Sequence, residues 1–405
     1  MTRGWQAAPP SRQATLERVA AVLPAAYART RNHLEGQVSG LSPYITHGVV
    51  TLREVVTQVV ARHPLEVTHK WIYELGWREY FRHVWAHVGS GILHSRHPGP
   101  LPEDAYAREM PIDVCCGQTG VPAVDEAVKM LYANGHLHNH ARMWLASYLV
   151  HLRRIHWRTG ADWMLSHLLD GDLASNHLSW QWVAATHSHK PYLFNADNVA
   201  RFAPASWHSK DTSIDQPYEV LEQIARGQRP PVMAQCAVPH DPLVPPHPCN
   251  QPHDVSALTT LDDLARDIQG REVWLVHPWA LRPPPAHRAS SLVVGVYLQN
   301  YHDTWPWTEG RWQWVDAVMR ELTPLRVHAD VAQLQKALSG ARAVHSVDEP
   351  HLNPWLQSLA QLDPPPTLFP AVDRLCPSFS QWWTRATRGL KWAQELCEVS
   401  IKDLG

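Results

Sequence analysis

The spacing of apolar residues changes abruptly past the middle of the chain. Over residues 12–229 they recur at helical spacing, as in THKWIYELGWREYFRHVWAHV, and few stretches alternate like strands. Residues 230–254 are dense in proline, which stiffens the chain and removes backbone donors. Residues 255–375 alternate short β-rich stretches with helical ones, which indicates a parallel sheet. We therefore expect a mainly α protein: a helical domain, a linker, a smaller Rossmann-like α/β domain and a helical tail over residues 376–405.

The α/β part contains five stretches that favour strands. They are REVWLVHP, SLVVGVYLQ, PLRVHAD, ARAVHSVD and PTLFPAV. The intervening RWQWVDAVMREL and VAQLQKALSG favour helices.

The composition is that of a globular protein. Hydrophobic residues make up 44% and charged residues 18% of the chain. No apolar run approaches the roughly 18 residues that a membrane span needs, and the first ten residues lack a secretory-type apolar stretch. We therefore expect a cytoplasmic location. The net charge of −2 gives no global attraction to nucleic acid, so DNA binding would need a local basic patch.

The cysteines form no standard ligand pattern, so we expect reduced thiols and no metal site. Two of the six, Cys115 and Cys116, are adjacent and no CxxC pair occurs, although four distant cysteines could still converge on an iron–sulfur cluster. The linker carries cysteines and histidines whose spacing matches no usual zinc site: Cys236, His240, His247, Cys249 and His253.

Two predicted helices carry polar residues on one aromatic-flanked face. Trp71, Glu74 and Arg78 recur at i, i+3 and i+4 steps, which allows either an exposed ion pair or a binding site. Asn139 and Arg142 share a face with small and apolar residues, which would allow a bulky ligand to approach closely.

Four segments, taken in order, resemble the FAD-binding domain of the photolyase/cryptochrome family. They are YARTRNHLEGQVSGLSPYITHG, WIYELGWREYF, QTGVPAVDEAVKMLYANGHLHNHARM and DGDLASNHLSWQW. The resemblance covers residues 12–204, about half of the chain. It implies a helical fold that buries a U-shaped FAD, whose chemistry the surrounding side chains tune.

The resemblance implies a set of flavin contacts. Arg142 and Asp170 match an ion pair against the isoalloxazine ring, and Asn176 matches the residue facing flavin N5, where asparagine is typical of DNA-repairing members. Arg78 matches an arginine near the diphosphate, which suits a forked cation. Val38 stands where threonine is usual, so one hydroxyl is lost there. The implied set is Tyr27, Val38, Ser39, Gly40, Leu41, Ser42, Trp71, Arg78, Asn139, Arg142, Asp170, Gly171, Asp172 and Asn176.

Three of the aromatic residues match an electron-transfer chain. Trp180 corresponds to the member nearest the flavin and Trp157 to the middle one. Tyr106 stands in the outer position, where tryptophan is usual, and tyrosine can also be oxidised.

The remaining matches imply repair of cyclobutane pyrimidine dimers. Trp77 and Trp182 match the walls of the lesion pocket, and Glu74 matches an acid that bonds the lesion's bases. Asn139 and Met143 stand where members that repair (6-4) photoproducts carry histidines. A dimer flipped out of duplex DNA would stack on these walls, at about 1–3 kcal/mol per base.

Arginines of the same region are expected to bind the DNA backbone. His140 stands where many members have an arginine, which would weaken DNA affinity or make it pH-dependent. The phosphate patch is expected to comprise Arg142, Arg153, Arg154 and Arg158, and the residues nearest the lesion are Glu74, Trp77, Arg78, His140 and Trp182.

The order of the domains departs from the family. Ordinary members begin with an α/β domain that can hold an antenna pigment, whereas the α/β stretch here follows the helical one. WLVHPWALR, SLVVGVYLQ and EGRWQWVDAVMREL faintly resemble the start of that domain. The α/β part is therefore either a permuted antenna domain or an unrelated one, and we assign no antenna site.

Three functions are compatible with these observations. The first is a light-driven lyase that repairs pyrimidine dimers in UV-damaged DNA with reduced FAD. The second is a cryptochrome-like photoreceptor that photoreduces FAD and signals without repair, through an unknown protein partner. The third is a flavin fold kept as a scaffold or a dark redox enzyme.

Overall fold

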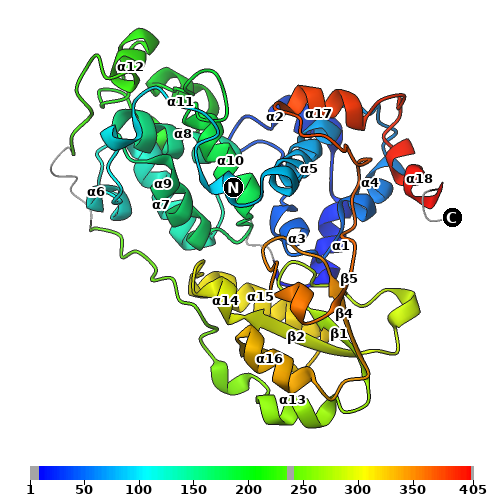
Figure 1. Cartoon of the computed structure of the whole chain (residues 1–405). Coiled ribbons are helices and arrows are strands. Elements are labelled where there is room, and N and C mark those ends of the chain that lie inside the picture. The colour runs from blue at the N-terminus through cyan, green and yellow to red at the C-terminus, as the bar shows by residue number, and fades with distance from the viewer. Residues whose placement is uncertain (1–8, 235–240, 403–405) are drawn as a thin grey trace.

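The computed structural model describes residues 9–234 and 241–402. The part expected to be helical is built from helices throughout (Figure 1). They are α1 (Arg12–Ala20), α2 (Pro24–Thr30), α3 (Ser42–Thr46), α4 (Leu52–Val60), α5 (Lys70–Val88), α6 (Ile112–Cys115), α7 (Pro122–Asn134), α8 (Asn139–Ser147), α9 (Trp157–His167), α10 (Leu173–Val183), α11 (Ala196–Phe202) and α12 (Tyr218–Ala225). A π-helical turn, Tyr148–Leu152, extends α8.

Local chemistry explains several of these boundaries. Pro24 begins α2, so the apolar pattern of residues 16–30 forms two helices instead of one. Thr51 and Glu54 form a reciprocal cap at the start of α4. The side chain of Asp172 caps α10 by accepting a hydrogen bond from Ser175 N.

The sheet is parallel, as predicted, and has the strand order β3-β2-β1-β4-β5. Its strands are β1 (Glu272–Val276), β2 (Leu292–Leu298), β3 (Arg326–Ala329), β4 (Ala343–Val347) and β5 (Gln361–Asp363). Helices α13 (Leu261–Asp267), α14 (Gln299–His302), α15 (Glu309–Leu322) and α16 (Val331–Leu338) accompany it. In the central register, Trp274 of β1 lies between Val293 of β2 and His345 of β4.

The prediction of a strand in PTLFPAV is wrong. Pro366 and Pro370 have no N–H to donate to a ladder. The amides of Leu368 and Phe369 donate instead to the Glu79 carboxylate of α5, at 2.6 and 3.0 Å. The fifth strand is the preceding QLD segment, β5.

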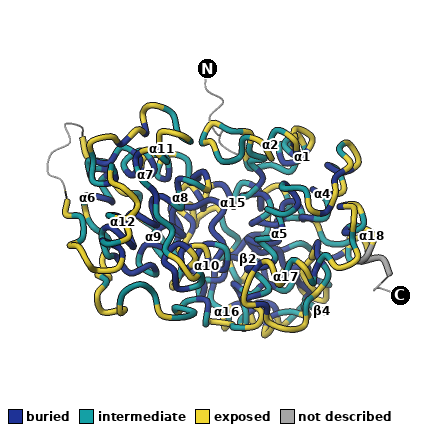
Figure 2. Tube along the Cα trace, turned by 90° about the horizontal axis from the view of Figure 1, so that it is seen from above, coloured by how far each residue is buried: buried dark blue, intermediate teal, exposed yellow. Residues whose placement is uncertain are grey.

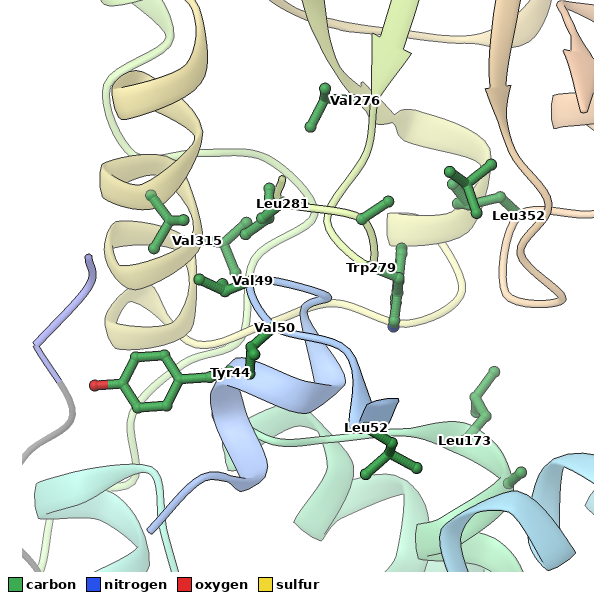
Figure 3. Close-up of a cluster of buried hydrophobic side chains, with 14 of the residues drawn as sticks. Tyr44, Val49, Val50, Leu52, Leu173, Val276, Trp279, Leu281, Val315 and Leu352 are labelled. Carbon is green, nitrogen blue, oxygen red and sulfur yellow. The ribbon is translucent and has the colours of Figure 1, made fainter. Parts of the chain in front are cut away.

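The chain forms two hydrophobic cores, and one of them combines segments that lie far apart in the sequence. One core joins α1–α5 and one side of α9 and α10 to the sheet and the tail, and the other lies within α6–α12. Buried segments continue from α8–α10 across to α5 (Figure 2). Figure 3 shows the first core where Val49 and Val50, between α3 and α4, lie near Leu281 and Val315 of the α/β part.

The C-terminal tail returns to the helical part. Helices α17 (Phe379–Ala386) and α18 (Glu395–Lys402) pack on α5 and α4, respectively (Figure 1). Val67 N donates to Lys391 O and Ala393 N donates to Leu65 O, both at 2.9 Å. The tail therefore covers α5 and does not extend from the sheet.

The linker holds no helix or strand in its described residues, 230–234 and 241–254. Cys249 exchanges backbone hydrogen bonds with Trp307, which ties the linker to the α/β part. Cys236 and His240 lie outside the described residues. The cysteines within them are free thiols, and no group of three His, Cys, Asp or Glu side chains there is arranged to hold a metal ion. None of the described helices is long and apolar enough to span a membrane.

Candidate functional site

The segments expected to hold a cofactor meet where the two cores join. Helix α10 packs on α5 from one core and on α8 and α9 from the other. It is consequently buried on nearly every side, and only Ser179 and Trp182 of its residues are exposed. Polar residues on α10 therefore face protein or a ligand instead of water.

Asp170 is the centre of a charged cluster that joins three elements. Arg142 of α8 donates through Nη2 to both Asp170 carboxylate oxygens, at 2.9 and 2.8 Å. Thr46 of α3 donates to the Asp170 carbonyl at 3.3 Å. Burial tends to raise the pKa of Asp170, but Arg142 and His136 hold it well below its usual range. The carboxylate is thus an anion with a fixed orientation.

Gly171 is required because an arginine of the α/β part lies against it. Arg311 of α15 is fully buried and donates through Nη2 to Gly171 O at 2.7 Å. A Cβ on residue 171 would lie 2.5 Å from Arg311 Nη1 and 2.9 Å from Leu165 O. Glycine, which has no Cβ, is therefore the residue type between the two aspartates of DGD that lets the Arg311 side chain approach the backbone.

Asp172 and Asn176 are both held by protein contacts. Asp172 Oδ1 accepts from Ser175 N at 2.8 Å and Oδ2 accepts from Arg82 at 2.6 Å. Asn176 Nδ2 donates to Ala161 O of α9 at 2.8 Å, which turns the amide oxygen away from that carbonyl. Ser175 Oγ is buried without a hydrogen-bond partner among the described residues, so it can bond a polar ligand.

The residues expected around the phosphates and ribityl chain are divided between two places. Tyr27, Val38 and Ser39 line a cavity of about 170 Å³ beside α1. Of the rest of that segment, Leu41 is buried, while Gly40 and Ser42 are half-buried. The Trp71 side chain is only 1% exposed in the first core.

Arg78 lies toward the α/β part. It donates to Thr46 Oγ1 at 2.7 Å and borders a second cavity, of about 430 Å³, which Arg82, Trp279 and Glu349 also line. This places a half-buried guanidinium between the cofactor segments and the α/β part.

The aromatic residues of the predicted electron path lie in a row. A Cβ on Gly160 of α9 would lie 2.4 Å from the Trp180 ring, so this indole rests on the helix that begins at Trp157. The His156 ring lies between Trp157 and Tyr106, at centroid distances of 5.7 and 6.4 Å. Trp180 and Trp157 are each 3% exposed and Tyr106 is half-buried, so the row runs outward.

Comparison with known proteins decides what kind of domain this is. Residues 71–212 match the sequence model of a family described as the FAD binding domain of DNA photolyase. Over these residues the chain has the sequence of a photolyase/cryptochrome-type FAD-binding domain. This confirms the resemblance of the three later segments, whereas the first, residues 27–48, lies outside the matched residues. FAD is the cofactor.

The related proteins match only part of this chain. The deoxyribodipyrimidine photo-lyase of Vibrio cholerae is 33% identical over 201 residues, which are 44% of this chain and 43% of the relative. The enzyme of that name from Escherichia coli is 34% identical over 162 residues, 36% of this chain and 33% of the relative. The chain thus spans less than half the length of these relatives. A Synechocystis cryptochrome structure aligns over 47% of this chain and 43% of its own, with 27% identity and a TM-score of 0.42.

The residues expected at the lesion are only partly accessible. Glu74 pairs with Arg31 and Lys70 at 3.4 and 2.9 Å and is one-quarter exposed. Asn139 is exposed, and its amide lies 3.4 Å from the sulfur of Met143. These residues and Trp182, 37% exposed, can be reached from solvent.

Trp77 does not form an open wall as predicted. Phe379 of α17 stacks on its ring at a centroid distance of 4.0 Å and an interplanar angle of 12°. A flipped base cannot stack on that face of Trp77 while α17 is in place. The sequence gave no sign of this because the two residues are 302 positions apart.

The predicted phosphate patch is not formed. Arg153 is paired with both Asp113 carboxylate oxygens at 2.6 and 3.1 Å, and Arg158 is paired with Asp162 at 2.8 Å. Arg154 donates to Arg229 O at 2.7 Å.

Helix geometry also separates the members of that patch. Arg142 and Arg153 lie near opposite ends of the continuous helical stretch 139–152, about 17 Å apart at 1.5 Å per residue. Arg142 is bound to Asp170. His140 packs against Phe202 at 5.4 Å, and burial lowers its pKa.

Four residues that sequence reasoning missed contact the DGD loop or its ion pairs. They are Arg82 of α5, Arg311 of α15, and Glu349 and His351 after β4. Arg82 follows Arg78 by one helical turn, which was the available signal for it. The other three residues are each more than 135 positions away from the residue that they contact, so no local sequence pattern indicated them.

Proposed function

We propose that this protein is a light-driven DNA repair flavoprotein that splits cyclobutane pyrimidine dimers. The observation that carries the proposal is the accessible group of Asn139, Met143 and Trp182, on the helices that also carry Arg142 and Asn176. The names of the curated relatives, deoxyribodipyrimidine photo-lyases, support the same substrate.

FAD held at this site, reduced and excited by light, would supply the electron that cleaves the dimer and would take it back. Arg142 and Asp170, a fixed ion pair, would orient its ring system, and the amide of Asn176 would contact it. Trp180 and Trp157 pass electrons inward from the surface to restore the reduced cofactor. Burial of α10 keeps bulk water from the ring and strengthens these interactions.

Glu74, Asn139, Met143 and Trp182 bind the lesion in this proposal. Trp182 stacks on one base, which contributes about 1–3 kcal/mol. Trp77 can stack on a base of the lesion only in a state in which α17 has moved away from it. The proposed partner is UV-damaged DNA, bound without the arginine patch that the sequence predicted.

The proposal is tested by repair of a single thymine dimer. Reduced protein is mixed with an oligonucleotide that carries one dimer and is illuminated with near-UV or blue light. We expect dimer loss in light and none in darkness. Trp182→Ala should reduce repair, whereas Trp392→Ala, which truncates a tryptophan of similar exposure (38% against 37%) in the tail, should not. No dimer loss by a protein that still photoreduces its flavin would refute repair.

A second candidate, a cryptochrome-like photoreceptor, is favoured by one observation. The stacking of Phe379 on Trp77 covers a wall that a repair enzyme needs and a sensor does not. Photoreduction through Trp180 without dimer loss would support this function.

A further inference from the structure

Two residues of the α/β part reach the loop that carries Asp172. Glu349 and His351 lie just after β4, where the sheet faces α5 and α10. Glu349 Oε1 accepts from Arg82 Nη1 at 2.7 Å, and Arg82 Nη2 donates to Asp172 Oδ2 at 2.6 Å. One guanidinium therefore bridges a carboxylate of the flavin domain and a carboxylate of the α/β part.

His351 makes a second connection to the same place. Its Nε2 accepts a hydrogen bond from Leu173 N at 3.1 Å, and its Nδ1 lies 2.5 Å from Glu349 Oε1. Because Leu173 N can only donate, Nε2 carries no proton and Nδ1 donates to Glu349. His351 is thus neutral, and it fixes the first turn of α10, the helix that carries Asn176.

The acids and the histidine of the network are buried, while the Arg82 side chain is 25% exposed. The side chains of Asp172 and His351 are fully buried and that of Glu349 is 8% exposed. Burial tends to raise the pKa of Glu349, but Arg82 and His351 lower it to about 2. Buried ion pairs of this kind hold one geometry firmly, because removing one partner leaves an uncompensated charge.

We propose that Glu349 and His351 are positioning residues for the flavin site. Glu349 sets the effective charge and orientation of Asp172 through Arg82. His351 sets the orientation of Asn176 through its hydrogen bond with the amide of Leu173. This inference rests on the flavin site of the proposed function and is independent of repair. It gives the C-terminal α/β part a role in the chemistry of the helical part.

The charge balance predicts a direction of change. Two carboxylates share Arg82, so the group of Asp172, Arg82 and Glu349 carries one net negative charge. Glu349→Gln keeps the shape and an oxygen acceptor but removes one negative charge. Reduced flavin should then be favoured roughly tenfold over oxidised flavin, the effect of one charge at about 10 Å in an effective dielectric of about 20.

The second variant changes a hydrogen bond without changing the charge. His351→Gln retains an acceptor that can reach Leu173 N, but with its oxygen there its amide N–H is no longer held where His351 Nδ1 lies, so the hydrogen bond to Glu349 is weakened. Glu349 then attracts Arg82 more strongly, so the positive charge of Arg82 neutralises the Asp172 carboxylate less. We expect a smaller change in the flavin equilibrium, of the opposite sign.

The experiment measures the flavin midpoint potential of the FAD-containing full chain by spectroelectrochemistry. FAD content and thermal unfolding are measured beside it. Asp267→Asn is the control, since it removes an exposed negative charge from α13 of the same α/β part. The inference is supported if Glu349→Gln raises the potential, Asp267→Asn does not, and His351→Gln lowers it.

Two results would overturn the inference. One is an unchanged potential in Glu349→Gln, and the other is a shift equal to that of Asp267→Asn. If Glu349→Gln does not fold, the inference is tested by the sign of the change in midpoint potential in His351→Gln, and a potential that is not lowered would overturn it. A wild-type protein that holds FAD but repairs no dimer would refute repair and leave this inference intact.

Discussion

Replacement of Gly171 by alanine should destabilise both the protein and its cofactor site. The new Cβ would lie 2.5 Å from Arg311 Nη1 and 2.9 Å from Leu165 O, and Arg311 is fully buried. Overpacking of this kind costs about 1–3 kcal/mol. Displacement of Arg311 would also leave the Gly171 carbonyl without its 2.7 Å donor, a further loss of about 1–3 kcal/mol. We expect the free energy of unfolding to fall by about 2–6 kcal/mol.

Urea unfolding followed by tryptophan fluorescence measures this loss, and absorbance of the purified protein gives the FAD content. The matched control is Gly310→Ala in α15, because a Cβ there meets nothing within 4 Å. That change should be neutral or stabilise by up to about 1 kcal/mol. If Gly171→Ala unfolds within about 1 kcal/mol of the parent and keeps its FAD, the packing argument for the DGD loop is refuted.

Three further predictions concern the tail, the electron path and pH. Phe379→Ala should lower the free energy of unfolding by about 3–5 kcal/mol, measured in urea, because the ring is 4% exposed; Leu375→Ala, at 37% exposed, should cost under about 1 kcal/mol. Trp180→Phe should slow flavin photoreduction while FAD stays bound, and Trp163→Phe on α9 should leave the rate unchanged; a normal rate in Trp180→Phe would contradict the path. Burial lowers the pKa of His47 to about 3, so the unfolded chain binds a proton below pH 6.5 that the folded chain cannot. Stability should therefore fall by about 1.4 kcal/mol per pH unit from this group between about pH 6.5 and 3, and His47→Gln should flatten the slope in urea titrations at several pH values.

Local sequence patterns predicted most of the helices and strands. Long-range contacts, which those patterns do not show, determine which side chains of the site are free to bind a ligand. The shared face of Trp71, Glu74 and Arg78 could be read from sequence because helical spacing is local. Nothing local shows that Phe379 covers Trp77 or that Asp113 neutralises Arg153, since each contact depends on how distant elements pack.

The same limit applies to the α/β part. Its strands could be read from β-rich stretches, except where prolines excluded the ladder. The contacts of Glu349 and Arg311 with the flavin domain depend on how the two parts dock. The family model matches residues 71–212 and none of the α/β part, so the origin of the α/β part as a permuted antenna domain stays a prediction.

The two cores have a consequence for how the chain folds during synthesis. Helices α1–α5 share their core with the sheet and the tail, and Arg53 of α4 donates to the carbonyls of Leu396 and Cys397, 343 and 344 positions later. Helices α6–α12 share a second core, so most of their contacts form within the middle of the chain, although α9 and α10 also pack in the first core. The N-terminal helices, made first, must wait for the last residues of the chain, and such distant contacts make folding slow. A chaperone that shields exposed apolar surface would therefore find its substrate in the beginning of this protein, while most contacts of the middle have already formed.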